Sequence, residues 1–198
     1  MSDLVMGIRP CLRQAIDLME GFHEAQNGQW GIWCPSWREP KAWAKQDLDE
    51  LEEEVMGLEY SPQKAFVMDQ ARTIWELGIA RNQTVSWVIR TRRPSVVVLL
   101  AMCEWADVEI RRVISGRLEE EDLTRLISVC WKVAPASIKV CDARNPVSLL
   151  KSLPQLVSEA ETSYVVCDWE LEGEELAVAR HLSLESEMKF LSQSPRLI

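Results

Sequence analysis

The sequence holds few of the residues that build metal sites and disulfide frameworks. It has only two histidines, His23 and His181, and none of its six cysteines forms a C-x-x-C pair. Most of the cysteines stand inside apolar runs, as buried and reduced thiols do in cytosolic proteins. We therefore expect neither a zinc site nor a redox-active pair of cysteines.

Excess basic charge and long apolar runs are absent too. The chain carries 22 Lys and Arg against 31 Asp and Glu, a net charge of −9. This charge repels nucleic acid and anionic membranes, so we do not expect nucleic acid as a partner. No apolar run approaches the ~20 residues of a membrane span, and the first ten residues lack the apolar core of a signal peptide. We expect a cytoplasmic protein without a membrane anchor.

What the sequence does contain is an ordinary globular balance, with 47% hydrophobic and 27% charged residues. Residues 8–26 carry Leu12, Ile16 and Met19 at helical spacing, which predicts an amphipathic helix. The next stretch, 27–46, is rich in Gly, Pro and Trp, and we interpret it as a connector packed by its own aromatic rings. A further helix is predicted to begin at Lys45.

From residue 64 onward the pattern alternates between apolar runs and amphipathic segments, which indicates an α/β fold with a mostly parallel sheet. The predicted strands are 64–68, 95–102, 137–142 and 163–168. The predicted helices are 70–91, 105–116, 118–134, 146–161 and 175–193. The run 95–102, SVVVLLAM, is expected to be a strand that is buried on both faces.

Three of the apolar runs end in a cysteine followed by a carboxylate, at Glu104, Asp142 and Asp168. The carboxyl ends of parallel strands lie on one edge of a sheet, so these side chains could converge there. One reading is a magnesium site or a general base beside a metal ligand. The other reading is that acidic residues simply begin the loops at these points.

The basic cluster RTRRPS, with Arg90, Arg92 and Arg93, is a candidate for phosphate contact. We place it at the start of the strand 95–102, on the edge opposite the carboxylates, and favour solvated charge as its role.

The order of the segments resembles DnaB-type bacterial replicative helicases. Ile8–Glu24 is similar to that family's linker helix, and Leu99–Trp105 stands where the family has a strand ending in its catalytic glutamate. Ile114–Leu126, ISGRLEEEDLTRL, is the most specific match, and Tyr164–Glu170, YVVCDWE, resembles the Walker B strand.

The resemblance implies a RecA-like three-layer fold preceded by a linker helix. It places residues 1–26 as the linker-like helix, 27–46 as the connector, and 47–198 as a RecA-like domain that is incomplete at its C-terminus. Leu12, Ile16 and Met19 would then bind another RecA-like or DnaB-type subunit, or a second copy of the chain. Glu104 would stand at the catalytic glutamate and Asp168 at the magnesium ligand.

The departures from the family concern the nucleotide site. The stretch FVMDQARTIW, at 66–75, stands where a motor has the glycine-rich phosphate loop, and it contains no glycine. Arg72 and Thr73 take the place of the motif's Lys and Thr, and Asp69 would face the phosphates with a like charge. After the Walker B strand, WELEGEEL is acidic where the family's loop faces DNA.

We therefore expect a protein-interaction module that has lost its ATPase activity, binds no cofactor, and regulates or assembles with a helicase. The alternative is a helicase-type enzyme that keeps ATP and magnesium chemistry through Glu104 and Asp168. In that case Asp142 would share the metal, and Arg72 with Thr73 would contact the nucleotide.

Overall fold

The structure, a computed structural model, describes residues 5–26, 43–90, 93–142, 145, 147, 150–151, 162–186 and 188–191. The chain forms two compact units. Unit 1 comprises Met1–Ile8, Arg72–Pro94 and Ala136–Ile198, and unit 2 comprises Arg9–Ala71 and Ser95–Pro135. The connector expected at 27–46 falls almost entirely outside the described residues.

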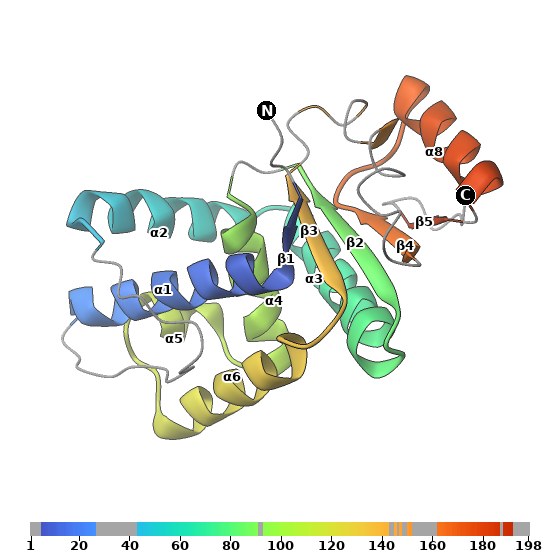
Figure 1. Ribbon diagram of the computed structural model, residues 1–198. Coiled ribbons are helices and arrows are strands. Elements are labelled where there is room, and N and C mark those ends of the chain that lie inside the picture. The colour runs from blue at the N-terminus through green and yellow to red at the C-terminus, as the bar shows by residue number, and fades with distance from the viewer. Residues whose placement is uncertain are drawn as a thin grey trace. The chain divides into compact units, whose positions relative to one another are not determined.

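Unit 1 is built on a five-stranded sheet (Figure 1). Its strands are β1 (Val5–Gly7), β2 (Thr84–Ile89), β3 (Ile138–Asp142), β4 (Thr162–Cys167) and β5 (Lys189–Leu191), in the spatial order β1-β3-β2-β4-β5. The four strands β3, β2, β4 and β5 are parallel, and the short β1 pairs antiparallel with β3 at the edge. The expected α/β fold with a mostly parallel sheet is confirmed.

The segment 70–91 was predicted as one helix, and this prediction is wrong at its C-terminal half. The helix α3 (Gln63–Ile74) continues through a π-helical turn, η1 (Trp75–Ala80), and the chain then passes into β2. Asn82 adopts a positive φ of 51°, a conformation that Asn tolerates better than most residues and that ends a helix. The run TVSWVI that follows is rich in β-branched residues and forms the central strand.

The described residues of unit 2 form helices: α1 (Ile8–Gln26), α2 (Lys45–Glu59), most of α3, α4 (Pro94–Ala106), α5 (Ile110–Ile114) and α6 (Glu120–Val133). Helix α1 has the predicted bounds, and α2 begins where expected. Trp43, just before α2, is bonded to α1, because its Nε1 donates a hydrogen bond of 3.0 Å to the Asp17 carbonyl. Figure 1 shows α1 and α2 running alongside each other.

Two predicted strands, 64–68 and 95–102, are helical in the structure. The first lies within α3 and the second within α4. Pro94 is the first residue of α4, a position that suits its fixed φ and missing N–H. From Val96 to Cys103 every residue of α4 is buried. A helix buried all round is apolar all round, so its sequence has the same pattern as a buried strand.

The remaining predicted elements agree better with the structure. The strands expected at 137–142 and 163–168 are β3 and β4, and the helices expected at 105–116 and 118–134 contain α5 and α6. Gly116 has a φ of +64° just after α5, as a helix-ending glycine does. The helix expected at 175–193 is shorter: α8 spans Gly173–Ser186, and β5 follows it. The predicted helix 146–161 is mostly outside the described residues.

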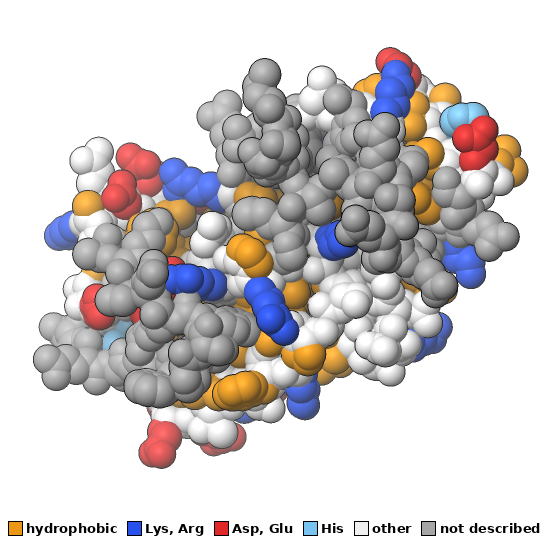
Figure 2. Space-filling model, viewed as in Figure 1, with side chains coloured by type: hydrophobic (Ala, Val, Ile, Leu, Met, Phe, Trp, Pro, Cys, Tyr) orange, Lys and Arg blue, Asp and Glu red, His pale blue; other side chains and the backbone are white. Residues whose placement is uncertain are grey.

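The placement of the basic side chains and the burial of the cysteines agree with what the composition predicted. On the face drawn in Figure 2, the described Lys and Arg side chains are scattered, and some of them lie beside Asp or Glu side chains. The five cysteines that the structure describes are buried and form no disulfide, as expected: Cys11, Cys103, Cys130, Cys141 and Cys167. No helix within the described ranges is long and apolar enough to cross a membrane.

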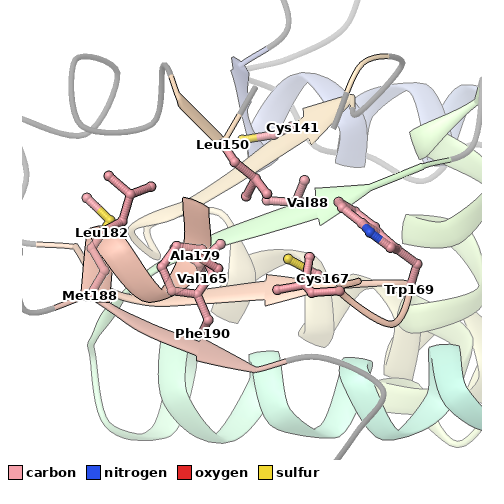
Figure 3. Packing of buried hydrophobic residues seen from close by; sticks show 11 residues of the cluster. Val88, Cys141, Leu150, Val165, Cys167, Trp169, Ala179, Leu182, Met188 and Phe190 are labelled. Carbon is pink, nitrogen blue, oxygen red and sulfur yellow. The ribbon is translucent and has the colours of Figure 1, made fainter. Parts of the chain in front are cut away.

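One face of the sheet carries the hydrophobic core of unit 1. Val88 on β2 is in register with Cys141 on β3 and Cys167 on β4, so the three side chains share a face. Ala179 and Leu182 of α8 pack against this face (Figure 3). The cluster also includes Trp169, just beyond the end of β4. The core therefore fixes the carboxyl end of β4, where Asp168 stands.

Candidate site at the carboxyl edge of the sheet

The order of the parallel strands defines a switch point between β2 and β4. The chain passes from β2 to β3 on one side, and then returns to β4 on the other side of β2. In open α/β sheets, ligands bind outside the carboxyl ends of the strands at such a point. The residues that emerge there are Arg90 after β2 and Asp168 after β4.

Two hydrogen bonds join these strand ends. The Asp168 backbone N–H donates to the Val88 carbonyl at 3.1 Å. The Arg90 backbone N–H donates to Oδ1 of Asp168 at 2.9 Å. The carboxylate is thereby held over the gap between β2 and β4, in the place where a ligand of this fold class would lie.

Burial raises the pKa of Asp168 to about 6. The Arg90 N–H and the Arg90 guanidinium act in the opposite direction, because both favour the ionised carboxylate. A carboxyl group that titrates near neutral pH can both take up and release a proton, which is the property of a general acid or base. Perturbed carboxylates of this kind are enriched at functional sites.

Trp169, at the carboxyl edge of the sheet, contacts both Glu175 and Arg90. Its side chain is buried, and its Nε1 donates a hydrogen bond of 2.7 Å to Oε2 of Glu175 at the start of α8. The Arg90 guanidinium lies over the ring at 5.8 Å from its centroid. A cation over an indole face is attracted by the ring quadrupole, so the ring helps to position the guanidinium.

Arg90 lies at the other end of a strand from the one predicted. Arg90 was expected at the start of a strand, on the edge opposite the carboxylates. It instead follows the strand β2 and contacts Asp168. The error has the same origin as the missed β2, since a helix was assumed to extend through residue 91. The β-branched run at 84–89 was the available signal.

Asp142 ends β3, and its Cα is in register with Ile89 at the end of β2. Its backbone therefore lies at the same edge as Asp168, while its side chain falls outside the described atoms. Across the part of the chain that the structure describes, no three His, Cys, Asp or Glu side chains come together as a metal site would require. A metal held by Asp142 and Asp168 stays a prediction.

Glu104 does not stand at the end of a strand. It lies near the C-terminal end of α4 in unit 2, where it lines a small cavity. The expectation that it ends a strand is wrong, because the apolar run before it is a helix. A shared site with Asp168 stays a prediction. The cysteine and carboxylate pairs at 141–142 and 167–168 are at strand ends, and the pair at 103–104 is not.

Arg72 and Thr73 lie in the last turn of α3. The stretch proposed to replace the phosphate loop, 66–75, thus runs through α3 into η1. The interior N–H groups of a helix are bonded to carbonyls one turn earlier and are not free to wrap phosphates. Contact between these two side chains and a nucleotide stays a prediction.

Leu12, Ile16 and Met19 share one face of α1, and all three are buried. The helical spacing of these residues therefore predicted an apolar face of α1 correctly. That face is covered in the folded chain, so a partner would have to displace α1 to reach it. Its role in partner binding stays a prediction.

No protein-family model matches the chain, and neither a curated protein nor a solved structure does so.

Proposed function

We propose that this chain acts by binding another protein and does not work as an ATP-driven motor. The observation that carries the proposal is the helical state of Gln63–Ile74. ATP-dependent motors of the P-loop class hold the phosphates in a loop whose backbone N–H groups point at the ligand. A helix that runs through this stretch leaves no such loop there.

The partner to test first is a RecA-like or DnaB-type helicase subunit. The proposal rests on the resemblance of Ile114–Leu126 and Tyr164–Glu170 to that family. The α/β fold with a parallel sheet is compatible with a RecA-like relationship, which is part of the proposal. A second copy of the chain is the alternative partner, and regulation or assembly of the helicase would be the role.

Calorimetry with purified protein tests the loss of the motor function. We expect no heat of binding when Mg-ATP is titrated into the chain at concentrations that saturate ordinary ATPases. Micromolar ATP binding would contradict the proposal. Partner binding is tested separately by size-exclusion chromatography of the chain mixed with the replicative helicase of the same cell. Co-elution supports the proposed partner, and independent elution of the two proteins rules it out.

A second candidate function is favoured by the geometry around Asp168. A carboxyl group with a pKa of about 6, next to a cation at a switch point, suits proton transfer or metal-assisted chemistry. This is the enzymatic alternative, in which Asp168 and Asp142 would hold the metal. Glu104 does not end a strand and is not part of this version of the site. If it holds, magnesium should raise the Tm of the wild type and leave Asp168→Asn unchanged. Equal responses of the two proteins would exclude a metal role for Asp168.

A further inference from the structure

Helix α6 of unit 2 (Glu120–Val133, yellow in Figure 1) carries a stripe of apolar side chains on its outer side. Leu123, Ile127 and Trp131 follow one another at intervals of four residues, and such positions lie on one side of a helix. Leu123 and Ile127 are partly exposed, and Trp131 is 60% exposed. The inner side of the helix is buried through Asp122, Leu126, Val129, Cys130 and Val133. The helix therefore has a second apolar side that the folded chain covers only in part.

The exposure of Trp131 sets this stripe apart. Within the described ranges, the large hydrophobic side chains that are exposed are Tyr60, Trp131 and Leu184. Tyr60 has a cation over its ring, since the Arg111 guanidinium lies 5.2 Å from the ring centroid. Trp131 instead extends a row of apolar side chains on its own helix. Tryptophan is enriched among the residues that carry the binding energy of protein interfaces, so the stripe suits contact with another helix.

The charges of α6 are divided between its two ends. Glu120 and Glu121 are exposed in the first turn, and Lys132 is exposed in the last turn. Arg9 of α1 adds a second cation at the end of α6, because its Nε donates a hydrogen bond of 2.7 Å to the Ala134 carbonyl. This polarity suits the helix dipole. It also makes the outer side of α6 complementary in charge to the same side of an antiparallel copy.

Helix geometry places the opposite charges in register for such a pair. Lys132 comes eleven residues after Glu121, which is about three full turns, so the two side chains lie on the same flank of the stripe. In a two-fold pair of antiparallel helices centred on Ile127, each flank meets the same flank of the second copy. Along the axis, Glu121 precedes the centre by about 9 Å and Lys132 follows it by about 7.5 Å. Lys132 of each copy would therefore face Glu121 of the other.

The apolar stripe is complementary to itself in the same arrangement. Ile127 would meet Ile127 of the second copy, and Trp131 would lie against Leu123 and Thr124 of the second copy. The indole supplies most of the apolar area of the contact. Exposed ion pairs add little affinity, so the main effect of the Glu121 and Lys132 pairs would be to fix the antiparallel orientation.

We propose that the outer side of α6 is the interface of a weak, two-fold symmetric dimer of this chain, with Trp131 as its anchor. The proposal rests on the proposed function only in taking a second copy as the partner, and it requires neither ATP nor the helicase. One pair of four-turn helices buries less than the about 1,200 Å² of a stable interface, and the net charge of −9 on each copy adds repulsion. We therefore expect a dissociation constant of about 10–500 µM.

Sedimentation equilibrium of the full chain tests the dimer and its anchor. Between about 10 µM and 1 mM protein at about 150 mM salt, the wild type should pass from monomer toward dimer. Trp131→Ala should weaken the dimer at least about tenfold, the usual effect of removing a central aromatic anchor. Leu184→Ala, which removes an equally exposed apolar side chain from α8, is the control and should leave the dimer unchanged. A wild type that stays monomeric, or a dimer that Trp131→Ala does not weaken, would overturn the proposal.

Charge reversal tests the antiparallel register. Glu121→Lys and Lys132→Glu should each weaken self-association at least about threefold, because like charges would then face each other at both ends of the interface. An equimolar mixture of the two variants should recover the wild-type affinity, since every facing pair in the mixed dimer is again of opposite charge. Glu53→Lys, which reverses an exposed acid on α2, is the control and should not weaken self-association.

The mixture also controls for misfolding of the variants. A variant that had lost its fold could not restore the dimer when it is mixed with the other, so recovery shows that both are folded. Tm is measured for every variant as a second check, and Trp131→Ala should keep the Tm of the wild type because its side chain is exposed. A mixture that associates no more tightly than either folded variant alone would contradict the antiparallel register.

These outcomes are separate from the tests of the proposed function. Sedimentation is carried out on the chain alone, without nucleotide or helicase. A monomeric wild type would reject the α6 dimer, while calorimetry and co-elution with the helicase still decide ATP binding and the first partner. A dimer that Trp131→Ala weakens and that the mixed charge variants restore would establish the outer side of α6 as a self-association surface.

Discussion

Asp122 is a buried carboxylate at the start of α6 that joins this helix to α5. Its side chain is 1% exposed. It lies 2.9 Å from Nη1 of Arg112 and 2.9 Å from Nη2 of Arg125, and it accepts a 3.1 Å hydrogen bond from the backbone N–H of Glu119. The last contact is half of a capping box that begins α6. A single acidic residue therefore caps one helix and neutralises two guanidinium groups.

Removing this carboxylate should be costly. We expect Asp122→Ala to lower the free energy of unfolding by about 2–3 kcal/mol, because the α6 cap and the charge-assisted hydrogen bonds to two partly exposed guanidinium groups are lost. Asp122→Asn keeps an acceptor for the cap and should lose less. The neighbouring exposed acid gives a matched control, since Glu121→Ala should change stability by less than about 1 kcal/mol. Urea unfolding measures all three, and similar losses for Asp122→Ala and Glu121→Ala would contradict the role of Asp122.

Asp168 should make the folded chain less stable as the pH rises, which is the reverse of the usual effect of a carboxyl group. Its folded pKa of about 6 is above the ordinary 3.8, so the folded state binds the proton more tightly than the unfolded state. The resulting stability is fully present below about pH 4 and is lost as the pH rises through about 6. Asp168→Asn removes this loss and still offers an oxygen to the Arg90 N–H.

The measurement is urea unfolding of both proteins at several pH values between about 4 and 7.5. Relative to the wild type, Asp168→Asn should gain about 2 kcal/mol across this interval. Glu170→Gln, an exposed neighbour, is the control and should show no such trend. A difference between Asp168→Asn and wild type that stays constant with pH would show that Asp168 has an ordinary pKa.

At the scale of elements, the connection from α3 to β2 depends on a close approach. Gly78 lies in the π-helical turn η1, beside the strand β3 of the same unit. A Cβ built on Gly78 would lie 2.9 Å from Cγ1 and 3.0 Å from Cδ1 of Ile138. Ile138 is itself 2% exposed, so it has little room to move. Glycine at this position lets the turn pack on the sheet.

Two Gly→Ala substitutions test this close approach. Gly78→Ala should destabilise the chain by about 1–3 kcal/mol, the usual cost of overpacking. Gly57→Ala, in α2, meets no heavy atom within 4 Å and should stabilise by about 0.5–1 kcal/mol, since alanine favours helices. Thermal or urea unfolding of the two variants gives the comparison. Equal effects would show that Gly78 does not make a tight contact.

For the whole molecule, net charge opposes contact with nucleic acid. The excess of nine negative charges repels a nucleic acid whichever way it approaches the chain. On the described part of the face in Figure 2, the basic side chains are not gathered into one patch. The segment after β4, Trp169–Glu175, contains four glutamates and no basic residue.

We therefore expect no binding of a labelled single-stranded oligonucleotide at about 150 mM salt, where only strong phosphate contacts persist. Fluorescence anisotropy makes the measurement, with a known single-strand-binding protein as the positive control. A weak signal that disappears between about 20 and 150 mM salt would agree with this expectation. Binding that persists at the higher salt concentration would contradict it.

The sequence by itself determined the elements that have a clear period or a clear end. Helix 8–26 and its buried residues Leu12, Ile16 and Met19 were predicted from helical spacing. β3 and β4 were predicted from short apolar runs that stop at a carboxylate, and this placed Asp142 and Asp168 at strand ends. These local patterns are sufficient because each of these elements either has one face toward solvent or ends at the edge of the sheet. At that face or end the sequence changes from apolar to polar residues.

Only the tertiary structure decided the elements that are buried on every side. The apolar run before Glu104 is a helix, and the mixed run 84–89 is the central strand. A fully buried segment has no polar face, so its sequence has no period that separates helix from strand. The same holds for the sheet edge: Arg90 and Asp168 are 78 residues apart in sequence. Their contact exists because β2 and β4 are neighbours in the sheet, which no local pattern records.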